Sequence, residues 1–164
     1  CLATYPEDQE MPTLGPHVGL SASAGGAVWA ATGEWQAMPI ALGAGVLPDA
    51  DHLVDYYFWY VRRNRSRAFF IFHAWEYLLA LVAAYVLSES PLALAGLAAY
   101  TTHLGSDQIF NPTFSWTYSV IARLHLKFDA ARVAPWDPNT AYEALIASAP
   151  FGRRILRDWF ARRG

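Results

Sequence analysis

Apolar residues dominate four stretches of the chain, and short polar or proline-containing segments separate these stretches. They cover residues 17–32, 36–50, 68–87 and 91–110. The last two have about the 20 residues that a helix needs to span a bilayer. The first two are shorter and rich in Gly, Ala and Ser, which lets helices pack closely. The pattern predicts an all-α protein, a membrane helical bundle of about four spans.

The two ends of the chain differ from this core. Residues 1–14 form a polar N-terminal leader, residues 15–112 the helical membrane core, and residues 113–164 a basic C-terminal region. Within the C-terminal region, apolar and arginine side chains alternate over about 150–162 in the manner of an amphipathic helix. Such a helix lies on an anionic membrane face or covers the core of a globular protein.

Composition and charge favour the membrane interpretation. Hydrophobic residues make up 54% of the chain and charged residues 16%, whereas about 25% is usual for charged residues in a soluble domain. All 12 Lys and Arg residues lie either between the second and third stretches or after residue 122. Because positive loops stay on the cytoplasmic side, this distribution predicts a multi-pass protein of the cell inner membrane with both termini cytoplasmic.

A second interpretation stays open, because the mean hydropathy is only +0.15. The apolar helices could instead form the dry core of a soluble, all-helical enzyme. Basic residues are balanced by acidic ones and no recognition motif is present, so we expect no nucleic-acid partner. The single cysteine excludes a cysteine zinc cage and any intrachain disulfide.

Histidine and aspartate residues recur at the ends of the apolar stretches. In the four-span topology these positions reach one depth band at the cytoplasmic membrane face, where imidazoles and carboxylates could bind one or two divalent ions. Zinc is the first choice for the metal and manganese the second. The candidate metal ligands are His17, Asp49, Asp51, His52, His73, His103 and Asp107.

Each of these pieces has an ordinary structural explanation when it is taken alone. The Asp49 to His52 segment could cap a helix, and His73 could make a polar contact between helices. Glu76 shares a helix face with His73 and could be a ligand, a partner that fixes the imidazole, or a general base. Asp51 and Glu76 are the candidate catalytic carboxylates.

With these residues, the chain resembles the membrane-bound metal-dependent hydrolases of the YdjM type, a family often described as a domain of unknown function. The family carries an early histidine, a Leu-Pro-Asp-x-Asp-His segment, a histidine that opens the next apolar helix, and a His-x-x-x-Asp pair. The corresponding positions here are His17, the segment 47–52, His73, and His103 with Asp107. The resemblance covers roughly residues 15–112 and implies metal binding.

The chain departs from the family pattern at the third position. The usual His-Arg-Gly…Thr-His-Ser segment is replaced by residues 68–74, which keep only His73. The family's Thr-Pro after the His-x-x-x-Asp pair is replaced by Asn111-Pro112, one residue further on. These departures leave the number of metal ions open.

Three functions follow from these patterns. The first is a metal-dependent hydrolase that acts on a phosphoester or lipid-like substrate at the cytoplasmic membrane face, with membrane lipid as a partner. The second is a non-catalytic membrane protein whose metal or polar site ties its helices together. The third is a soluble, helical enzyme similar to the zinc-dependent phospholipases C.

Overall fold

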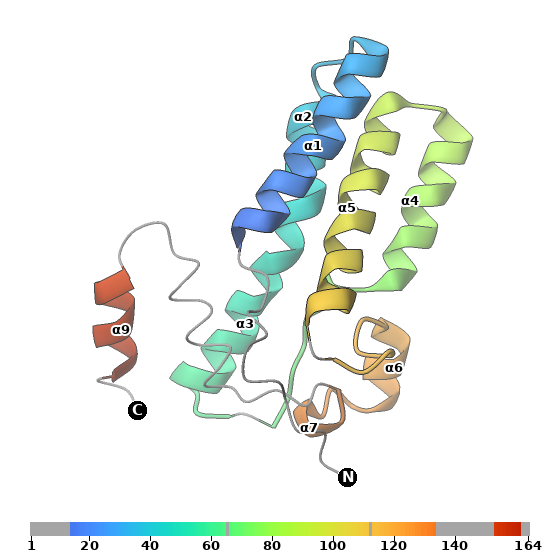
Figure 1. Ribbon diagram of the computed structural model, residues 1–164. Helices are drawn as coiled ribbons and strands as arrows, with labels where there is room; N and C mark the ends of the chain where they lie inside the picture. Colours follow the sequence, from blue (N-terminus) through green and yellow to red (C-terminus); the bar gives the residue numbers. More distant parts are fainter. Residues whose placement is uncertain (1–13, 65, 112, 134–152, 162–164) are drawn as a thin grey trace.

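Each of the four apolar stretches contains a helix in the computed structural model of the chain, which describes residues 14–64, 66–111, 113–133 and 153–161. These helices are α1 (Leu14–Thr32), α2 (Ala37–Val46), α4 (Trp75–Ser88) and α5 (Pro91–Phe110). Helices α1, α2 and α5 pack against one another, and α4 packs against α5 (Figure 1). Ser90 caps α5 by accepting a hydrogen bond from the backbone N–H of Leu92, as expected for a serine at this position.

Shorter helical elements follow the long helices at one end of the bundle. After α2 come a 3-10 turn η1 (Leu47–Asp51), the short helix α3 (His52–Tyr56) and a π-helical turn η2 (Tyr57–Val61). After α5 come α6 (Val120–His125), α7 (Ala130–Val133) and, further along the chain, α9 (Arg153–Ala161). The described residues contain no strand, only one isolated bridge between Arg67 and Asp129. The prediction of an all-α protein is therefore confirmed.

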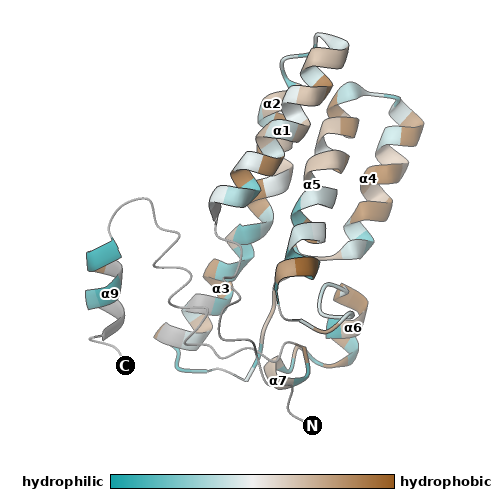
Figure 2. Cartoon of the chain, viewed as in Figure 1, coloured by the Kyte–Doolittle hydropathy of each residue, from teal (hydrophilic) through white to brown (hydrophobic). Residues whose placement is uncertain are grey.

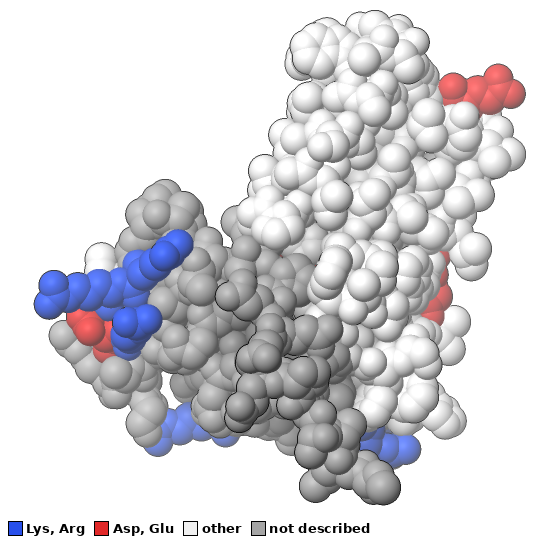
Figure 3. All heavy atoms as spheres, in the orientation of Figure 1, with Lys and Arg blue, Asp and Glu red and all other residues white. Residues whose placement is uncertain are grey.

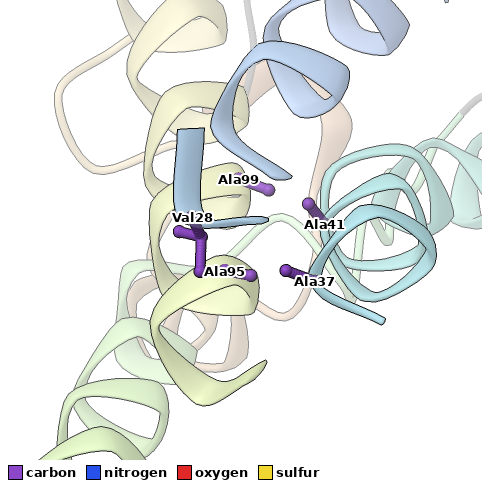
Figure 4. Close-up of a cluster of buried hydrophobic side chains, with 5 residues drawn as sticks. All are labelled: Val28, Ala37, Ala41, Ala95 and Ala99. Carbon is purple, nitrogen blue, oxygen red and sulfur yellow. The ribbon is translucent and has the colours of Figure 1, made fainter. Parts of the chain in front are cut away.

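Small side chains let α1, α2 and α5 approach closely. Their shared buried cluster consists of one valine and four alanines (Figure 4): Val28, Ala37, Ala41, Ala95 and Ala99. The tightest point is Gly45 on α2, where an added Cβ would lie 1.9 Å from Ser21 Oγ on α1 and 3.3 Å from the Ala99 carbonyl oxygen on α5. Glycine is required there because no other side chain fits between the three helices.

Helix α4 contributes little to this core. None of its side chains is buried, and Leu79 and Leu87 are 73% and 86% exposed. Figure 2 shows the apolar colouring on this helix, which contacts the bundle through α5. Much of the chain's apolar content therefore lies on the surface of the bundle.

The prediction of membrane-spanning helices is wrong for the part of the chain that the structure describes. No helix there combines the length and the apolarity that crossing a bilayer requires. Helix α2 ends after 10 residues, where η1 with Pro48 begins, and α4 starts at Trp75 instead of residue 68. Helices α1 and α5 are longer, but α1 is rich in Gly and Ser, and α5 carries Thr, His, Ser, Asp and Gln in its second half. A transmembrane bundle is therefore not supported.

Basic side chains gather around α9 and towards the end of the bundle that carries α6 and α7. On the face drawn in Figure 3, the Lys and Arg side chains lie near α9 and towards the end that carries α6 and α7, and none covers the upper parts of α1 and α2. On this face, the segregation of positive charge noted in the sequence is thus also a segregation in space. The same end carries the histidines and aspartates described next.

Candidate metal centre

Four separate segments bring histidine and aspartate side chains to one end of the bundle. His17 lies near the start of α1, Asp49 lies in η1, and His73 immediately precedes α4. His103 and Asp107 are one turn apart near the end of α5, so one helix face presents both side chains. The helices run alternately up and down, and for this reason residues distant in sequence meet here.

Asp107 is at the centre of the buried part of this cluster. Its Oδ1 lies 3.2 Å from His17 Nε2, and its Oδ2 lies 3.3 Å from both His73 Nε2 and His103 Nε2. The two Nε2 atoms of His73 and His103 are 3.0 Å apart. All four residues are at most 3% exposed. Three imidazoles therefore point their Nε2 atoms at one carboxylate in a site that water barely reaches.

Asp49 and His52 form the more open side of the cluster. Asp49 Oδ1 lies 3.5 Å from His73 Nε2, 3.8 Å from His103 Nε2 and 4.0 Å from His52 Nε2. The side chains of Asp49 and His52 are 21% and 27% exposed, in contrast to the buried members. A small molecule approaching the cluster would therefore meet Asp49 and His52 first.

Asp51 lies behind His73 and fixes its orientation. The Nδ1–H of His73 donates to Asp51 Oδ1 at 3.1 Å, and the backbone N–H of Phe72 donates to Asp51 Oδ2 at 2.6 Å. Because Nδ1 is engaged, the Nε2 of His73 is aimed at the cluster. Carboxylates hold metal-binding histidines in this way in many metal sites. The structure thus gives Asp51 a positioning role and does not group it with the atoms that converge on the cluster.

The backbone before His73 forms a pinned loop instead of the first turns of a helix. The N–H groups of Phe69 and Phe70 donate to Asp55 at 2.7 and 3.2 Å. Tyr100 donates its hydroxyl hydrogen to the carbonyl oxygen of Phe72 at 2.6 Å. These backbone groups are hydrogen-bonded to Asp55, Asp51 and Tyr100, so they are not used for helical hydrogen bonds. Helix α4 therefore begins only after the loop. This loop holds His73 at the end of the bundle.

Electrostatics places a proton on His73 in the metal-free cluster. Burial disfavours its charged form, but hydrogen bonds to Asp107, Asp49 and Asp51 outweigh burial and raise the pKa of His73 well above 6.5. Burial and the positive charge of His73 lower the pKa of His103 to about 4. Burial opposes the charged form of Asp107, but its hydrogen bonds to His17 and His73 hold its pKa below the ordinary value. His103 is thus neutral and can accept a hydrogen bond from the Nε2–H of His73.

Among the described residues, two buried atoms of the cluster have no hydrogen-bond partner, Asp49 Oδ2 and His103 Nδ1. An unpartnered buried carboxylate oxygen is costly, and a cation close to Asp49 would remove that cost. The described residues offer two groups of potential ligand atoms, each with all its atoms within 4.8 Å of one another. A donor set of imidazoles and carboxylates suits zinc and also manganese. The cluster could therefore hold a divalent metal ion.

Glu76 faces α6 and caps its N-terminus. Its carboxylate accepts hydrogen bonds from Ser119 Oγ at 2.5 Å and from the backbone N–H groups of Val120 and Ile121 at 3.1 Å. Glu76 belongs to neither group of potential metal ligands. Its geometry indicates a structural role in joining α4 to α6 instead of a role in the cluster.

The Glu76→Gln variant tests this structural role. We expect it to lower the free energy of unfolding by about 1 kcal/mol, because one backbone N–H of α6 loses its acceptor, and to leave the metal content unchanged. Thermal unfolding and elemental analysis measure the two effects, with the exposed Glu89→Gln as the matched control. A loss of metal in Glu76→Gln at unchanged stability would instead place Glu76 in the site.

Sequence reasoning missed residues that support the cluster from distant segments. Arg123 on α6 is fully buried, and its guanidinium nitrogens have no hydrogen-bond partner in the part of the chain that the structure describes. Burial lowers the pKa of Arg123, and the negative charges of Asp51 and Glu76 oppose that shift. The sequence could have indicated Asp55, because Asp55 lies one helical turn after the candidate residue Asp51. No sequence pattern predicted the burial of Arg123, because its neighbours in the sequence indicate a surface position.

Comparison of the chain with protein-family models, with curated proteins and with solved structures finds no match. The resemblance to the YdjM-type hydrolases, which rests on His17, the segment 47–52, His73, His103 and Asp107, therefore stays a prediction. What can be concluded about function comes from the cluster itself.

Proposed function

We propose that the chain is a metal-dependent hydrolase whose histidine and aspartate cluster binds the catalytic metal. The observation that carries this proposal is the number of converging donors. A structural zinc site is closed by four protein ligands, whereas six side chains take part in the two groups here: His17, Asp49, His52, His73, His103 and Asp107. A site that only tied helices together would need fewer carboxylates and no open side.

Different residues of the cluster would have different roles in such an enzyme. A bound zinc or manganese ion would lower the pKa of a coordinated water and polarise the oxygen of the bond to be cleaved. Asp107 and His103 hold the buried side of the site, and Asp51 keeps the Nε2 of His73 directed into it. Asp49 and His52 border the exposed side, where a substrate would enter.

The surroundings of the open side favour a phosphoester with an apolar portion. Leu47, Leu53 and Val54 lie next to Asp49 and His52 in the sequence, and they are 65%, 64% and 43% exposed. Exposed apolar side chains that are this close in the sequence to ligands of a polar site offer contact surface to an alkyl or acyl group. Phosphoester oxygens are suitable ligands for zinc or manganese.

A substrate screen tests the proposed activity. The chain loaded with zinc or manganese is assayed with phosphoesters that carry short and long alkyl groups, before and after chelation. We expect turnover that requires the metal and that is faster with the long alkyl group. A chain that binds metal stoichiometrically and unfolds at a higher temperature with it, but hydrolyses none of the esters, would contradict the proposal and indicate a structural metal site.

The Asp51→Asn variant is predicted to bind metal roughly 10–100-fold more weakly, the usual effect of removing a partner that orients a ligating histidine. An asparagine can still accept one of the two hydrogen bonds from Phe72 and His73, so the fold should persist. Isothermal titration with zinc measures the affinity, and Asp129→Asn is the matched control because Asp129 lies outside the cluster. Equal affinities of the two variants would argue against the positioning role of Asp51.

Metal binding at pH 7 is predicted to release protons from His73 and from His17, because the pKa of both is raised and a ligating imidazole must be neutral. The raised pKa means that His73 is protonated below that pKa in the metal-free chain. The stability that His73 contributes is therefore fully present below pH 6.5 and is lost as the pH rises through its folded-state pKa. Calorimetry in buffers of different ionisation enthalpy measures the released protons, and the release should vanish at high pH. Release that does not change with pH would contradict this assignment.

A further inference from the structure

The potential ligands of the cluster fall into two groups. One group contains His17, Asp49, His103 and Asp107, and the other contains Asp49, His52 and His73. Asp49 is the single member that both groups share. Within each group, one ligand atom from every residue lies within 4.8 Å of the others.

One ion cannot use all six side chains in the arrangement that the structure shows. Zinc is usually four-coordinate, and its ligand atoms lie about 2.0–2.2 Å from it, so two ligands of one ion are at most about 4.4 Å apart. Among the described residues, the six side chains form two groups, and within each group the ligand atoms lie within 4.8 Å of one another. The geometry therefore suits two neighbouring ions better than one.

Asp49 is placed to serve both ions. Its Oδ1 lies 3.8 Å from His103 Nε2 of one group, and 3.5 Å from His73 Nε2 and 4.0 Å from His52 Nε2 of the other. Its Oδ2 is buried and has no hydrogen-bond partner. A carboxylate with two such oxygens can bridge two ions, and paired ions in hydrolytic sites are typically about 3.5–4 Å apart.

The charge of the cluster supports the same conclusion. Three carboxylates face the imidazoles, those of Asp49, Asp51 and Asp107, and a histidine that binds metal is neutral. With one divalent ion the three carboxylates keep a net negative charge, and the buried guanidinium of Arg123, which interacts with Asp51, offsets it. With two divalent ions the cluster becomes positive and attracts an anionic phosphoester.

We propose that the cluster holds two divalent ions bridged by the carboxylate of Asp49. His17, His103 and Asp107 complete the ligands of the buried ion, and His52 and His73 those of the more exposed ion. This inference rests on the proposed function, because it assumes that the cluster binds metal. It goes further by fixing the number of ions and by giving Asp49 a role that the other aspartates lack.

Manganese titration of the full chain, followed by electron paramagnetic resonance, tests the two-ion site without measuring activity. We expect wild type to bind two Mn²⁺ ions per chain and to give the spectrum of a spin-coupled pair. His52→Ala should bind one ion and give the spectrum of an isolated Mn²⁺. His125→Ala is the matched control, since His125 is exposed on α6 and outside both groups, and it should behave as wild type.

Two results would overturn the inference alone and leave the proposed function standing. One is a wild-type chain that saturates with a single, magnetically isolated Mn²⁺, which would leave the proposed hydrolase with a one-ion site. The other is two bound ions without spin coupling, which would remove Asp49 as the bridge. A chain that binds no manganese or zinc at all would overturn the proposed function together with the inference, so the two failures are distinguishable.

Discussion

The Asp107→Asn variant should lose metal binding and also destabilise the metal-free chain. The carboxylate of Asp107 contacts the Nε2 atoms of three buried histidines within 3.2–3.3 Å. In the metal-free chain it compensates the positive charge of His73, and breaking a buried ion pair from one side costs about 3–5 kcal/mol. Deprotonation of His73 would offset part of this cost at neutral pH. The metal loses a charged ligand that neutral asparagine replaces poorly.

Chemical denaturation of the metal-free proteins and zinc titration of the folded proteins measure the two effects separately. Asp129→Asn removes the same charge at a site outside the cluster, where asparagine can still accept the hydrogen bond from the backbone N–H of Ala131. Asp129→Asn should therefore behave as wild type in both assays. If Asp107→Asn kept wild-type zinc affinity, Asp107 would not be a ligand, and its assignment to the metal site would be wrong.

The Gly45→Ala variant should disturb the cluster from one helical turn away. The added Cβ would lie 1.9 Å from Ser21 Oγ and 3.3 Å from the carbonyl oxygen of Ala99. Overpacking of this kind costs about 1–3 kcal/mol, more than the gain from replacing glycine with alanine within a helix. The three contact positions each lie four residues from a cluster residue: Ser21 from His17, Gly45 from Asp49, and Ala99 from His103. Spreading the helices should therefore weaken metal binding as well as stability.

Gly43→Ala provides the matched comparison on the same helix. Its added Cβ would meet only Leu47 Cδ1 at 3.9 Å, an ordinary contact, so the variant should be as stable as wild type or up to about 1 kcal/mol more stable. Adding Ser21→Ala to Gly45→Ala removes the closest clashing atom and should recover part of the lost stability. Equal unfolding free energies for Gly43→Ala and Gly45→Ala would show that the helices do not meet as closely at Gly45 as described.

The helices could be predicted from the sequence because each apolar stretch ends at a clear signal. Ser90 and Pro91 mark the start of α5, and Asn111 follows its end at Phe110. The same reasoning predicted that His17, His73 and His103 would meet, because helices joined by short turns alternate in direction and so bring their ends together. That expectation was drawn from a membrane topology, but the order and alternating direction of the helices are enough to bring these residues together.

The membrane-spanning prediction was wrong because apolar composition does not specify where a helix begins. The start of α4 depends on hydrogen bonds from the backbone of residues 69–72 to Asp51 and Asp55, which lie more than a dozen residues earlier in the chain. Likewise, Glu76 was grouped with His73 by helix spacing, yet its carboxylate is bonded to α6, more than 40 residues later. Contacts between residues so far apart along the chain leave no periodic pattern of apolar and polar positions in a single sequence.

The most direct test of a metal centre is the elemental content of the purified chain, measured for wild type beside His103→Ala. His103 is buried and its Nε2 lies 3.3 Å from Asp107, so its removal takes away a ligand at the centre of the cluster. The cluster predicts near-stoichiometric or higher zinc or manganese in wild type and a marked loss in the variant. A wild-type chain that is free of metal, and stays so after incubation with either ion, would contradict the presence of a metal centre and leave the histidines as polar contacts between helices.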